Sequence, residues 1–576
     1  MFEFHPGLIL IISAIAAMVL PRRARQAVMI AGPLLAILAV FQLEIGTVVT
    51  YSFINNMDLI LMKVDKLSWV FALIFSIMSL LGCIYSLHIK NSGEAAAALG
   101  YAGSSLGVVF AGDWMTLIVF WELMAITSVF LIWYRANPQS VGAGLRYFLV
   151  HTLGGNILLA GIFLQVSGGQ FEVGVLTGNN DLAFWLILAG VSINAAIPPL
   201  HAWLTDAYPE GTVTGSVFLS SFTTKVAVYT LIRIFPGTEL LVWAGVIMAL
   251  YGVVYAVLEN DIRRLLAYHI ISQVGYMVAA VGIGTELALN GAVAHAFSHI
   301  LYKSLLFMGA GAVIYSTGRR KLSELGGFFR KMPLTVILYT VGAFSISGVP
   351  LFNGFISKSM IISAAGYNHM PSVELLLLLA SVGTFLHTGL KLPYFMFFGP
   401  DRGIKPVSIP KNMHAAMAGG AFLCTLFGVA PILLYAKLPF NATYVPYTLD
   451  HVISTLQLLV ATLAAFWIFI PKLGGEPTVS VDTDWFYRRP LVNFTVGLVT
   501  AVSAARDYSG LVGNKLLERT VPYFRNPFLI ITGKTPVAPE AGRITVYDEN
   551  RYRFPIGFTI FLIVLMMAVT FSYIYV

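Results

Sequence analysis

The chain has 576 residues, of which 58% are hydrophobic and only 11% are charged. Soluble domains carry about 25% charged residues, so a soluble core cannot bury this much apolar surface and lipid must cover it. The formal net charge of +8 fits the basic loops of a membrane protein better than a nucleic-acid-binding surface. Cys83 and Cys424 lie in apolar runs and lack the spacing of a metal site.

Apolar runs long enough to cross about 30 Å of hydrocarbon recur along the chain. The first is followed by Arg22, Arg23 and Arg25, the reverse of a cleavable signal, so it predicts an uncleaved span. We predict an all-α polytopic membrane protein of about 16 transmembrane helices. The predicted spans are residues 6–20, 27–44, 67–89, 95–111, 114–133, 143–166, 183–199, 211–234, 238–258, 264–283, 288–315, 332–365, 373–399, 413–436, 448–470 and 556–575.

Basic residues gather in alternate loops of this scheme. Residues 167–181 and 284–290, on the opposite side, contain no lysine or arginine. Cytoplasmic loops carry the excess of positive charge, so the pattern predicts an outside N-terminus. The basic residues that fall on the predicted inner side are Arg22, Arg23, Arg25, Arg135, Arg263, Arg264, Arg319, Arg320, Lys321, Arg330, Lys331, Arg402, Lys405 and Lys411.

Two predicted spans are interrupted. The first contains Pro198-Pro199 within residues 197–203, and the second contains Gly348 and Pro350 within residues 347–354. Broken helices in two halves of a chain indicate a transporter built from inverted repeats, with its site near the membrane midplane. A tolerated kink or a short loop is the alternative interpretation of each break.

The remaining organisation follows from composition. Residues 1–60 hold the N-terminal transmembrane helices, 61–440 the core, and 441–473 one additional span. Residues 474–555 are more polar and contain an amphipathic stretch from about Val492 to Tyr523, which predicts a helix along the membrane surface or another subunit. A simple cytoplasmic loop is the alternative. Residues 556–576 predict a C-terminal span.

Ionisable residues deep inside spans cost about 3 kcal/mol on insertion scales, so each is a functional hypothesis. Glu122 follows Trp121 in an apolar run, and Lys225 lies far from either end of its span. A buried carboxyl beside a movable cation can act as a proton switch, and a buried lysine can lose its proton near neutral pH. A static buried ion pair is the alternative for Glu122.

His295, His299 and Lys303 follow one another at intervals of four residues, which places all three on one helical face. A line of such groups is typical of a proton wire. Hydrogen-bonded core histidines are the alternative. Zinc is not expected, because two histidines at this spacing lack a third ligand.

Lys358 directly follows the second break, and the alternative for it is a lysine that snorkels to the interface. His151, on the span of Arg146, and His387 with Lys391 are weaker candidates. Arg263 and Arg264 are expected to anchor the inner end of a span. The chain has no dinucleotide fingerprint, phosphate-binding loop or iron–sulfur cysteine set, so we predict no metal, no cofactor and no redox centre in it.

In this order the motifs resemble the antiporter-like family shared by Mrp sodium/proton antiporters, the membrane arm of respiratory complex I and membrane-bound hydrogenases. The resemblance covers roughly residues 60–440. The Thr-Thr-Lys and Pro-Leu-His-Ala-Trp segments are most similar to the D-type subunit of Mrp antiporters, whereas the tail from Asp482 resembles the longest members of the family. The motifs are Trp121-Glu122, Pro199–Tyr208, Thr223–Val226, Asp261–Gly275, His295–Lys303 and Gly354–Lys358.

The resemblance implies a role for each matching residue. Glu122 would be the uptake-side proton switch and Lys225 the bridge between two half-channels. His295, His299 and Lys303 would form the relay, and Lys358 would be the terminal proton carrier. His201, within the first break motif, is an accessory candidate.

Two positions depart from the family pattern. Asn194 stands where the family has the lysine that pairs with the glutamate, and asparagine carries no charge. Lys225, Arg146 and His151 are the candidates to replace that lysine. Arg263 stands where several relatives have lysine, and arginine can anchor but cannot relay a proton.

The resemblance implies a proton-translocating component of a multi-subunit Na⁺/H⁺ antiporter in a prokaryotic plasma membrane. Its partners would be other membrane subunits, protons, sodium ions and lipid, and not nucleic acid. One alternative is the proton-pumping component of a complex I-like or hydrogenase redox complex, in which this chain is a translocase subunit. The others are the membrane partner of an inorganic-carbon uptake system and a non-transporting scaffold in which Asn194 marks a dead channel.

Overall fold

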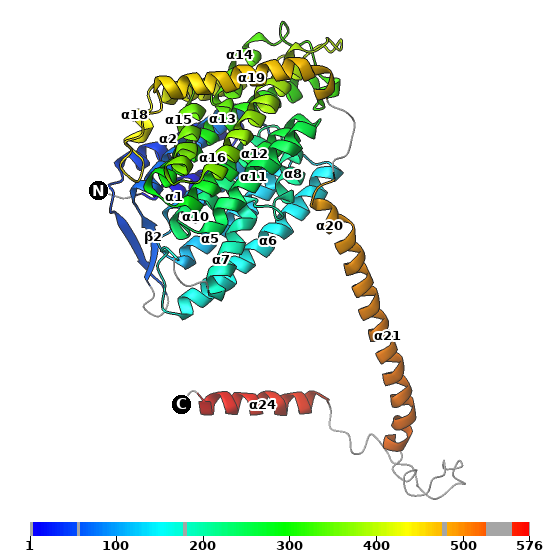
Figure 1. Cartoon of the computed structure of the whole chain (residues 1–576). Helices are drawn as coiled ribbons and strands as arrows, with labels where there is room; N and C mark the ends of the chain where they lie inside the picture. Colours follow the sequence, from blue (N-terminus) through cyan, green and yellow to red (C-terminus); the bar gives the residue numbers. More distant parts are fainter. Residues whose placement is uncertain (1–3, 54–57, 177–180, 475–480, 526–555, 575–576) are drawn as a thin grey trace, which may run out of the picture. The chain divides into compact units, whose positions relative to one another are not determined.

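The computed structural model describes residues 4–53, 58–176, 181–474, 481–525 and 556–574. The chain forms two compact units, Met1–Asp484 and Trp485–Val576. The first unit is a dense bundle of helices, coloured blue to orange in Figure 1. The predicted all-α fold is confirmed.

Most helices of the first unit coincide with a predicted span or with part of one, whereas α8 lies between two predicted spans. The helices of this unit are α1 (Pro6–Val19), α2 (Arg22–Gln42), α3 (Lys66–Ser86), α4 (Ser92–Phe110), α5 (Trp114–Trp133), α6 (Pro138–Ser167), α7 (Leu182–Ala195), α8 (Ala202–Ala207), α9 (Gly215–Leu219), α10 (Thr223–Ile234), α11 (Glu239–Leu258), α12 (Ile262–Ile283), α13 (Glu286–Thr317), α14 (Pro333–Ser347), α15 (Asn353–Tyr367), α16 (Pro371–Thr384), α17 (Lys411–Val429), α18 (Ile432–Tyr435) and α19 (Leu449–Leu473).

Short polar side chains fix where several spans begin. Asp113 accepts a hydrogen bond from the Thr116 amide at the start of α5, and Asp181 does the same for Phe184 at the start of α7. Asn137 and Ser140 form a reciprocal capping box at α6. These caps satisfy amides that have no partner within their own helix.

Within the described residues, eleven helices are long and apolar enough to cross a membrane, and four shorter apolar helices accompany them. The predicted span 95–111 coincides with α4, which is outside both groups. Nearly all of α4 is buried, and it is rich in glycine, alanine and serine. Such a helix is shielded from lipid by its neighbours, so it needs small packing residues more than hydropathy.

A two-stranded hairpin between α2 and α3 was not predicted. Strand β1 (Val48–Ser52) pairs antiparallel with β2 (Asp58–Lys63). Its position is held by Asp113, whose carboxylate accepts a hydrogen bond of 2.6 Å from the Ile60 amide. The apolar run Leu59–Met62 was the available signal, but a run this short cannot be told from part of a helix.

Both predicted helix breaks are present. Helix α7 stops at Ala195, and Ala196 has a positive φ of 59° before α8 resumes at Ala202. Helix α14 stops at Gly348, with φ of 75°, and α15 resumes at Asn353. These positive φ values end each helix by turning the chain out of the α-helical path.

Two further irregularities were missed. Residues 220–222 separate α9 from α10 within one predicted span. Helix α16 continues into the π-helical segments η4 (Phe385–Lys391) and η5 (Tyr394–Phe398). Single π-helical turns inside helices frequently mark functional positions. His387 and Lys391 both lie in η4.

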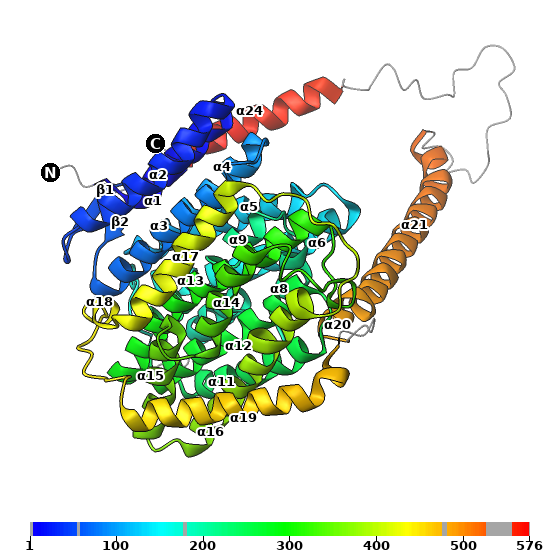
Figure 2. The same ribbon diagram turned by 90° about the horizontal axis from the view of Figure 1, so that it is seen from above.

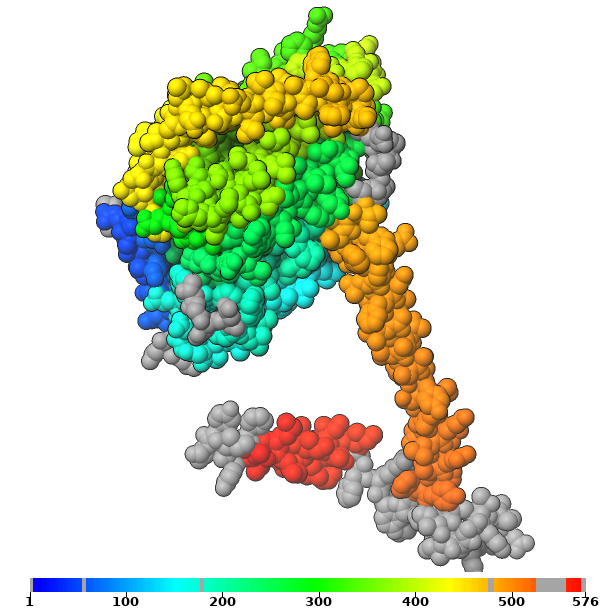
Figure 3. All heavy atoms as spheres, in the orientation of Figure 1, coloured from blue at the N-terminus to red at the C-terminus, as the bar shows by residue number. Residues whose placement is uncertain are grey.

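The centre of the first unit is formed by α10, α12 and α13, whose side chains are almost all buried. Figure 2 shows α12 and α13 inside the ring of other helices. Helix α19 runs beside α16 along the outside of this unit, and its yellow to orange surface is visible in Figure 3.

The second unit contains α20 (Asp484–Arg488), α21 (Pro490–Arg525) and α24 (Ile556–Ile574). Helix α21 covers the predicted amphipathic stretch and has 36 residues. Helix α24 covers the predicted C-terminal span. Residues 526–555 of the predicted 474–555 segment lie outside the described residues. Placement of α21 along a membrane surface stays a prediction.

Helices α11 and α12 make the tightest helix pair, and glycines permit it. A Cβ added at Gly252 would lie 2.5 Å from the Ser272 amide nitrogen, and one at Gly245 would lie 2.2 Å from that of Ala279. The two backbones therefore meet directly, as is common where small residues line a membrane helix interface.

We expect Gly252→Val to destabilise the protein by about 1–3 kcal/mol, because overpacking forces the two backbones apart. The measurement is the melting temperature of the detergent-solubilised protein. Gly174→Val is the matched control, since a Cβ there meets nothing within 4 Å. Equal melting temperatures for the two variants would contradict this account of the α11–α12 contact.

Candidate functional site

Glu122 is a half-buried carboxylate that has no partner among the described residues. It lies on α5, and its Oε1 would be 1.7 Å from a Cβ added at Gly155 of α6. The absence of a side chain at Gly155 therefore makes room for the carboxylate. No described residue forms a hydrogen bond or an ion pair with Glu122. Its expected cationic partner is thus missing from this structure.

Asn194 forms a neutral pair with His151. The Asn194 Oδ1 lies 2.8 Å from His151 Nδ1, and both side chains are buried. The imidazole packs between Tyr147 and Trp203, with ring centroids 4.2 and 4.4 Å away. Within the described part of the chain, Asn194 Nδ2 and His151 Nε2 have no partner. The pair occupies the place of the lysine that the family resemblance implies.

The other two candidate substitutes are engaged elsewhere. Arg146 forms a two-point ion pair with Asp206, with Nε–Oδ2 at 2.6 Å and Nη2–Oδ1 at 3.0 Å. Lys225 is fully buried, and its Nζ donates to the Ser220 carbonyl at 2.5 Å. The structure therefore places none of Lys225, Arg146 and His151 in contact with Glu122 among the described residues.

Lys225 sits at the unpredicted break between α9 and α10. Ser220 is the C-terminal cap of α9, so its carbonyl lacks a helical amide partner. Ser221 of the same break lies 2.8 Å from Ser304 of α13, hydroxyl to hydroxyl. Ser304 follows Lys303 directly. The break thus joins Lys225 to the helix that carries the predicted relay.

One branch of polar contacts starts at Lys303. Its Nζ lies 3.2 Å from His269 Nδ1, and His269 Nε2 lies 3.2 Å from Thr384 Oγ1. The His269 ring packs against that of His387, with centroids 4.9 Å apart. Four residues later Lys391 donates to the carbonyls of Val257, at 2.5 Å, and Glu259, at 3.1 Å. This branch leads from the bundle centre to the end of α11.

A second branch starts at His295. Its Nδ1 lies 3.0 Å from Ser357 Oγ, and its Nε2 lies 3.4 Å from the Tyr302 hydroxyl. Tyr302 in turn donates to Gln273 Oε1 at 3.3 Å. Gln273 Nε2 donates to Thr384 at 3.3 Å, so the two branches meet there. The predicted face of α13 is therefore part of a continuous polar network.

His299 lies in the middle of this network without a hydrogen bond. It is fully buried, and neither of its ring nitrogens has a partner among the described residues. Its ring lies 6.3 Å from that of His295 and 5.3 Å from that of Tyr302. Buried polar atoms are usually satisfied by protein or by water. An open imidazole here can accept and release a proton through water.

Lys358 lies just after the second helix break and is 3% exposed. Its Nζ donates to the Ile346 carbonyl at 3.0 Å and to Ser381 Oγ at 3.3 Å. It also borders a cavity of about 400 Å³ between α14, α15, α16 and α19, which Glu374 and His451 line as well. The ammonium is therefore held at the wall of a cavity that contains further ionisable side chains.

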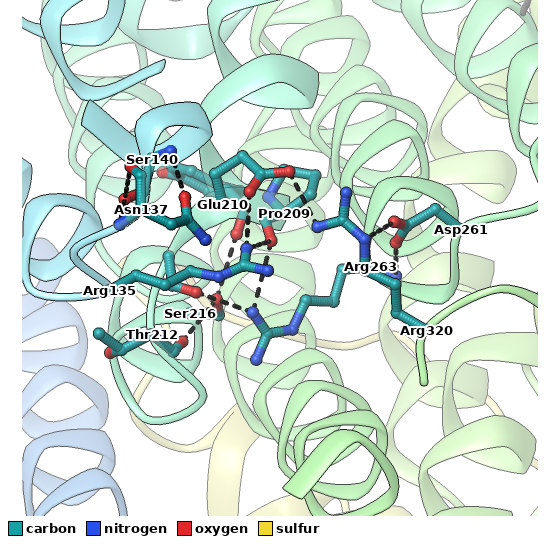
Figure 4. A network of polar contacts seen from close by, with 12 residues as sticks. Arg135, Asn137, Ser140, Pro209, Glu210, Thr212, Ser216, Asp261, Arg263 and Arg320 are labelled. Carbon is teal, nitrogen blue, oxygen red and sulfur yellow. Dashed lines mark hydrogen bonds and ion pairs between the residues drawn. The ribbon is translucent and has the colours of Figure 1, made fainter. Parts of the chain in front are cut away.

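A separate ionic network joins the basic loops, as Figure 4 shows. Glu210 pairs with Arg135 at 2.7 Å and with Arg320 at 2.8 Å. Arg320 also pairs with Asp261 at 2.7 Å. Arg263 donates to the Gly211 carbonyl at 2.8 Å. Arg263 thus ties α12 to the loop after α8, as an anchoring residue does.

Sequence reasoning missed four members of the polar network at α13. His269, Gln273, Tyr302 and Thr384 connect the predicted residues, yet none was singled out. His269 and Gln273 are four residues apart in the Asp261–Gly275 motif, so helical spacing could have marked them as one face. Thr384 had no such signal, because it comes from a helix far along the chain.

The comparisons with known proteins agree with this geometry. Residues 111–386 match the family described as NADH:quinone oxidoreductase/Mrp antiporter, transmembrane region. An uncharacterised protein of Methanocaldococcus jannaschii is 30% identical over 366 residues, which cover 60% of this chain and 76% of that protein. The chain belongs to this family. The matched region contains every predicted relay residue from Glu122 to Lys358.

Two further relatives extend the comparison. A probable K⁺/H⁺ antiporter component of the A/B type, from Rhizobium meliloti, is 31% identical over 400 residues. The match covers 64% of this chain but only 40% of that relative, so the chain spans less than half of its length. One polypeptide of the Mrp complex from Dietzia has the same fold, with a TM-score of 0.71 at 23% identity, covering 94% of this chain and 64% of that one.

We expect Glu210→Gln to lower the free energy of unfolding by about 1–3 kcal/mol, because two arginines lose their shared carboxylate. Thermal melting of the purified protein measures this. Glu172→Gln is the control, because Glu172 pairs with Lys63 at the surface, where the two side chains are 62% and 40% exposed, respectively. Exposed pairs contribute about 0.5 kcal/mol. A control as damaging as Glu210→Gln would show that the network adds nothing.

Proposed function

We propose that this chain is the proton-translocating component of a multi-subunit monovalent cation/proton antiporter, with sodium or potassium as the coupled ion. The observation that carries the proposal is a set of four buried lysines without acidic partners. None of them forms an ion pair with a carboxylate among the described residues. The four are Lys225, Lys303, Lys358 and Lys391.

Such lysines suit proton transfer. A permanently charged ammonium inside a bundle carries a large desolvation penalty unless a counter-charge is present. Carbonyl and imidazole partners can hold either the charged or the neutral form, so the proton can leave without breaking an ion pair. The histidines between the lysines supply ring nitrogens that can accept and release a proton.

The contacts support a route between Lys391 and Lys358. Lys391 reaches the end of α11, close to the basic loops, and His387, His269 and Lys303 lead from there to the centre. His295 and Ser357 lead on toward Lys358 and its cavity. In the first half of the chain, Glu122 and Lys225 would serve the cation-linked step that the sequence implies.

Fewer observations support the redox, carbon-uptake and scaffold functions than support the antiporter function. The family also includes components of NADH:quinone oxidoreductases, but the sequence offers no motif that fixes a redox partner, and the matched Rhizobium relative is named as an antiporter component. A carbon-uptake partner has no feature of its own here. A scaffold would not need a polar network through its centre. Assignment to the D type rests on the break motifs, whereas the Rhizobium relative is named as the A/B type.

The proposed orientation places the N-terminus outside a prokaryotic plasma membrane. Arg135, Arg263 and Arg320 come from three loops far apart in sequence, and they meet in one network. This gathering supports the positive-inside count, because alternating spans put those loops on the same face.

We expect Lys303→Ala and Lys225→Ala each to reduce cation/proton exchange about ten-fold or more, equivalent to about 1.4 kcal/mol in the barrier. The assay is sodium- or potassium-induced pH change in inside-out vesicles that contain the whole complex. Lys411→Ala, at an exposed helix start, is the control. Full exchange in both variants at normal protein levels would refute the proposed relay.

We also expect only membrane subunits to accompany the chain when it is purified gently from its native membrane and analysed by mass spectrometry. An antiporter is driven by an ion gradient and needs no electron-transfer chain. Co-purification of flavin or iron–sulfur proteins in fixed ratio would contradict the antiporter assignment and favour the redox alternative.

A further inference from the structure

Asp482 is a buried carboxylate that lies far in sequence from the motifs that carry the family resemblance. It follows α19 in the first unit, and its side chain is 0% exposed. His201 Nε2 lies 3.1 Å from its Oδ1, and the Tyr268 hydroxyl donates to its Oδ2 at 2.6 Å. The Tyr251 hydroxyl donates to Oδ1 as well. Residues from α8, α11 and α12 therefore converge on one acidic side chain.

The donors keep this carboxylate ionised. Burial by itself would raise the pKa of the Asp482 carboxyl, but the hydrogen bond and the charge of His201 lower it below its usual value. The two tyrosine hydroxyls act in the same direction. A carboxylate with several donors is stabilised in its charged form.

The contact with Asp482 determines which ring nitrogen of His201 carries the proton. His201 is the last residue of the first helix break, and it is fully buried. Because an ionised Asp482 can only accept, His201 must donate from Nε2. Its other nitrogen, Nδ1, then carries a free lone pair, and within the described residues that nitrogen has no partner.

We propose that Asp482 is a positioning residue for proton transfer at His201, so that the segment after α19 supplies the acidic group of the first helix break. This inference rests on the proposed proton-translocating function. His201 takes a proton from water at Nδ1 and becomes an imidazolium whose charge Asp482 balances. It returns to the neutral form when the same proton leaves Nδ1 for the next water. The Nε2–H stays on His201 and points at Asp482 throughout, so no other group changes its proton count.

Within the described residues, three tyrosines and one arginine surround the pair. Tyr251 and Tyr255 face the pair from α11, and Tyr268 faces it from α12. Arg264 on α12 lies 3.5 Å from Glu259, which offsets its charge. Asp484 follows two residues after Asp482 in the chain.

The His201–Asp482 pair also supplies a carboxylate–imidazole contact that the other described candidate residues in the first half of the core do not form. Asn194 is neutral, Asp206 is clasped by Arg146, and Glu122 has no partner among the described residues. A buried acid–base pair at the end of the break restores a site where charge can change. The pair lies at the start of α8, directly after the break. Trp203 of α8 donates to the carbonyl of Ile193 in α7, the residue before Asn194.

The test is Asp482→Asn in the full complex, with exchange measured across pH in inside-out vesicles. Asparagine keeps a hydrogen-bond acceptor but removes the charge, so a merely structural contact would tolerate it. We expect exchange to fall about ten-fold, and the pH of half-maximal exchange to fall by about one unit, because the imidazolium loses its counter-charge. Asp482→Glu should restore part of the rate. Asp401→Asn, an exposed acid paired with Lys331 at 2.7 Å, is the matched control.

The composition of the complex and its melting temperature separate the outcomes. A normally assembled Asp482→Asn complex with the wild-type rate and pH profile would overturn the inference, while loss of exchange in Lys225→Ala in the same experiment would leave the proposed function standing. Wild-type exchange in both variants would refute the two together. Loss of exchange only in proportion to lost assembly would make Asp482 an anchor and also overturn the inference.

If Asp482→Asn does not assemble, the His201→Gln variant decides. Glutamine can still donate to Asp482 but cannot be protonated there. Lost exchange in this variant supports the inference, and retained exchange overturns it.

Discussion

Three buried lysines of this protein are held by the carbonyl groups of helix ends. Lys225 bonds the Ser220 carbonyl after α9, Lys358 bonds the Ile346 carbonyl in the last turn of α14, and Lys391 bonds the Val257 carbonyl in the last turn of α11. The last carbonyls of a helix have no amide partners and carry a partial negative charge. They can stabilise an ammonium group without the fixed full charge of a carboxylate.

This contact explains why the helix breaks and the lysines occur together. A continuous helix would expose no free carbonyl at membrane depth, and a lysine there would be stranded in an apolar medium. The breaks after α9 and α14 create the acceptors, and the lysines satisfy them. The helix breaks and the lysines therefore offset each other's cost in the membrane. Because the carbonyls carry only a partial charge, the lysine proton can leave without breaking an ion pair.

The two halves of the core differ in how they use this arrangement. The second half has a continuous set of polar contacts that runs from Lys303 to His295 through His269, Thr384, Gln273 and Tyr302. Lys391 lies beyond it and bonds carbonyls at the end of α11. The first half has a neutral pair, His151 with Asn194, and an unpaired Glu122 within the described residues. Among the described residues no cation pairs with Glu122 beside Asn194, and our proposals place the charge chemistry at Lys225 and at the His201–Asp482 pair.

Much of the fold could be predicted from sequence because span length and helical spacing are local properties. The two breaks with proline or glycine were found, and so was the shared face of His295, His299 and Lys303. The break at Ser220 was missed because serine, unlike proline, does not announce a helix end. Thr384 and Asp482 were missed as site residues because their partners lie more than 100 residues away in sequence, where spacing gives no signal. The absence of a partner for Glu122 among the described residues was the least predictable feature. It depends on the side-chain directions of residues on three helices.

The most direct test of the central claim is proton movement driven by a cation gradient alone. The purified native complex would be reconstituted into liposomes with a pH-sensitive dye inside, and a sodium or potassium gradient imposed without any redox substrate. The account predicts a lumenal pH change that follows the direction of the gradient and vanishes when the gradient is dissipated. A tight, correctly assembled preparation in which the pH does not respond to either cation would contradict it.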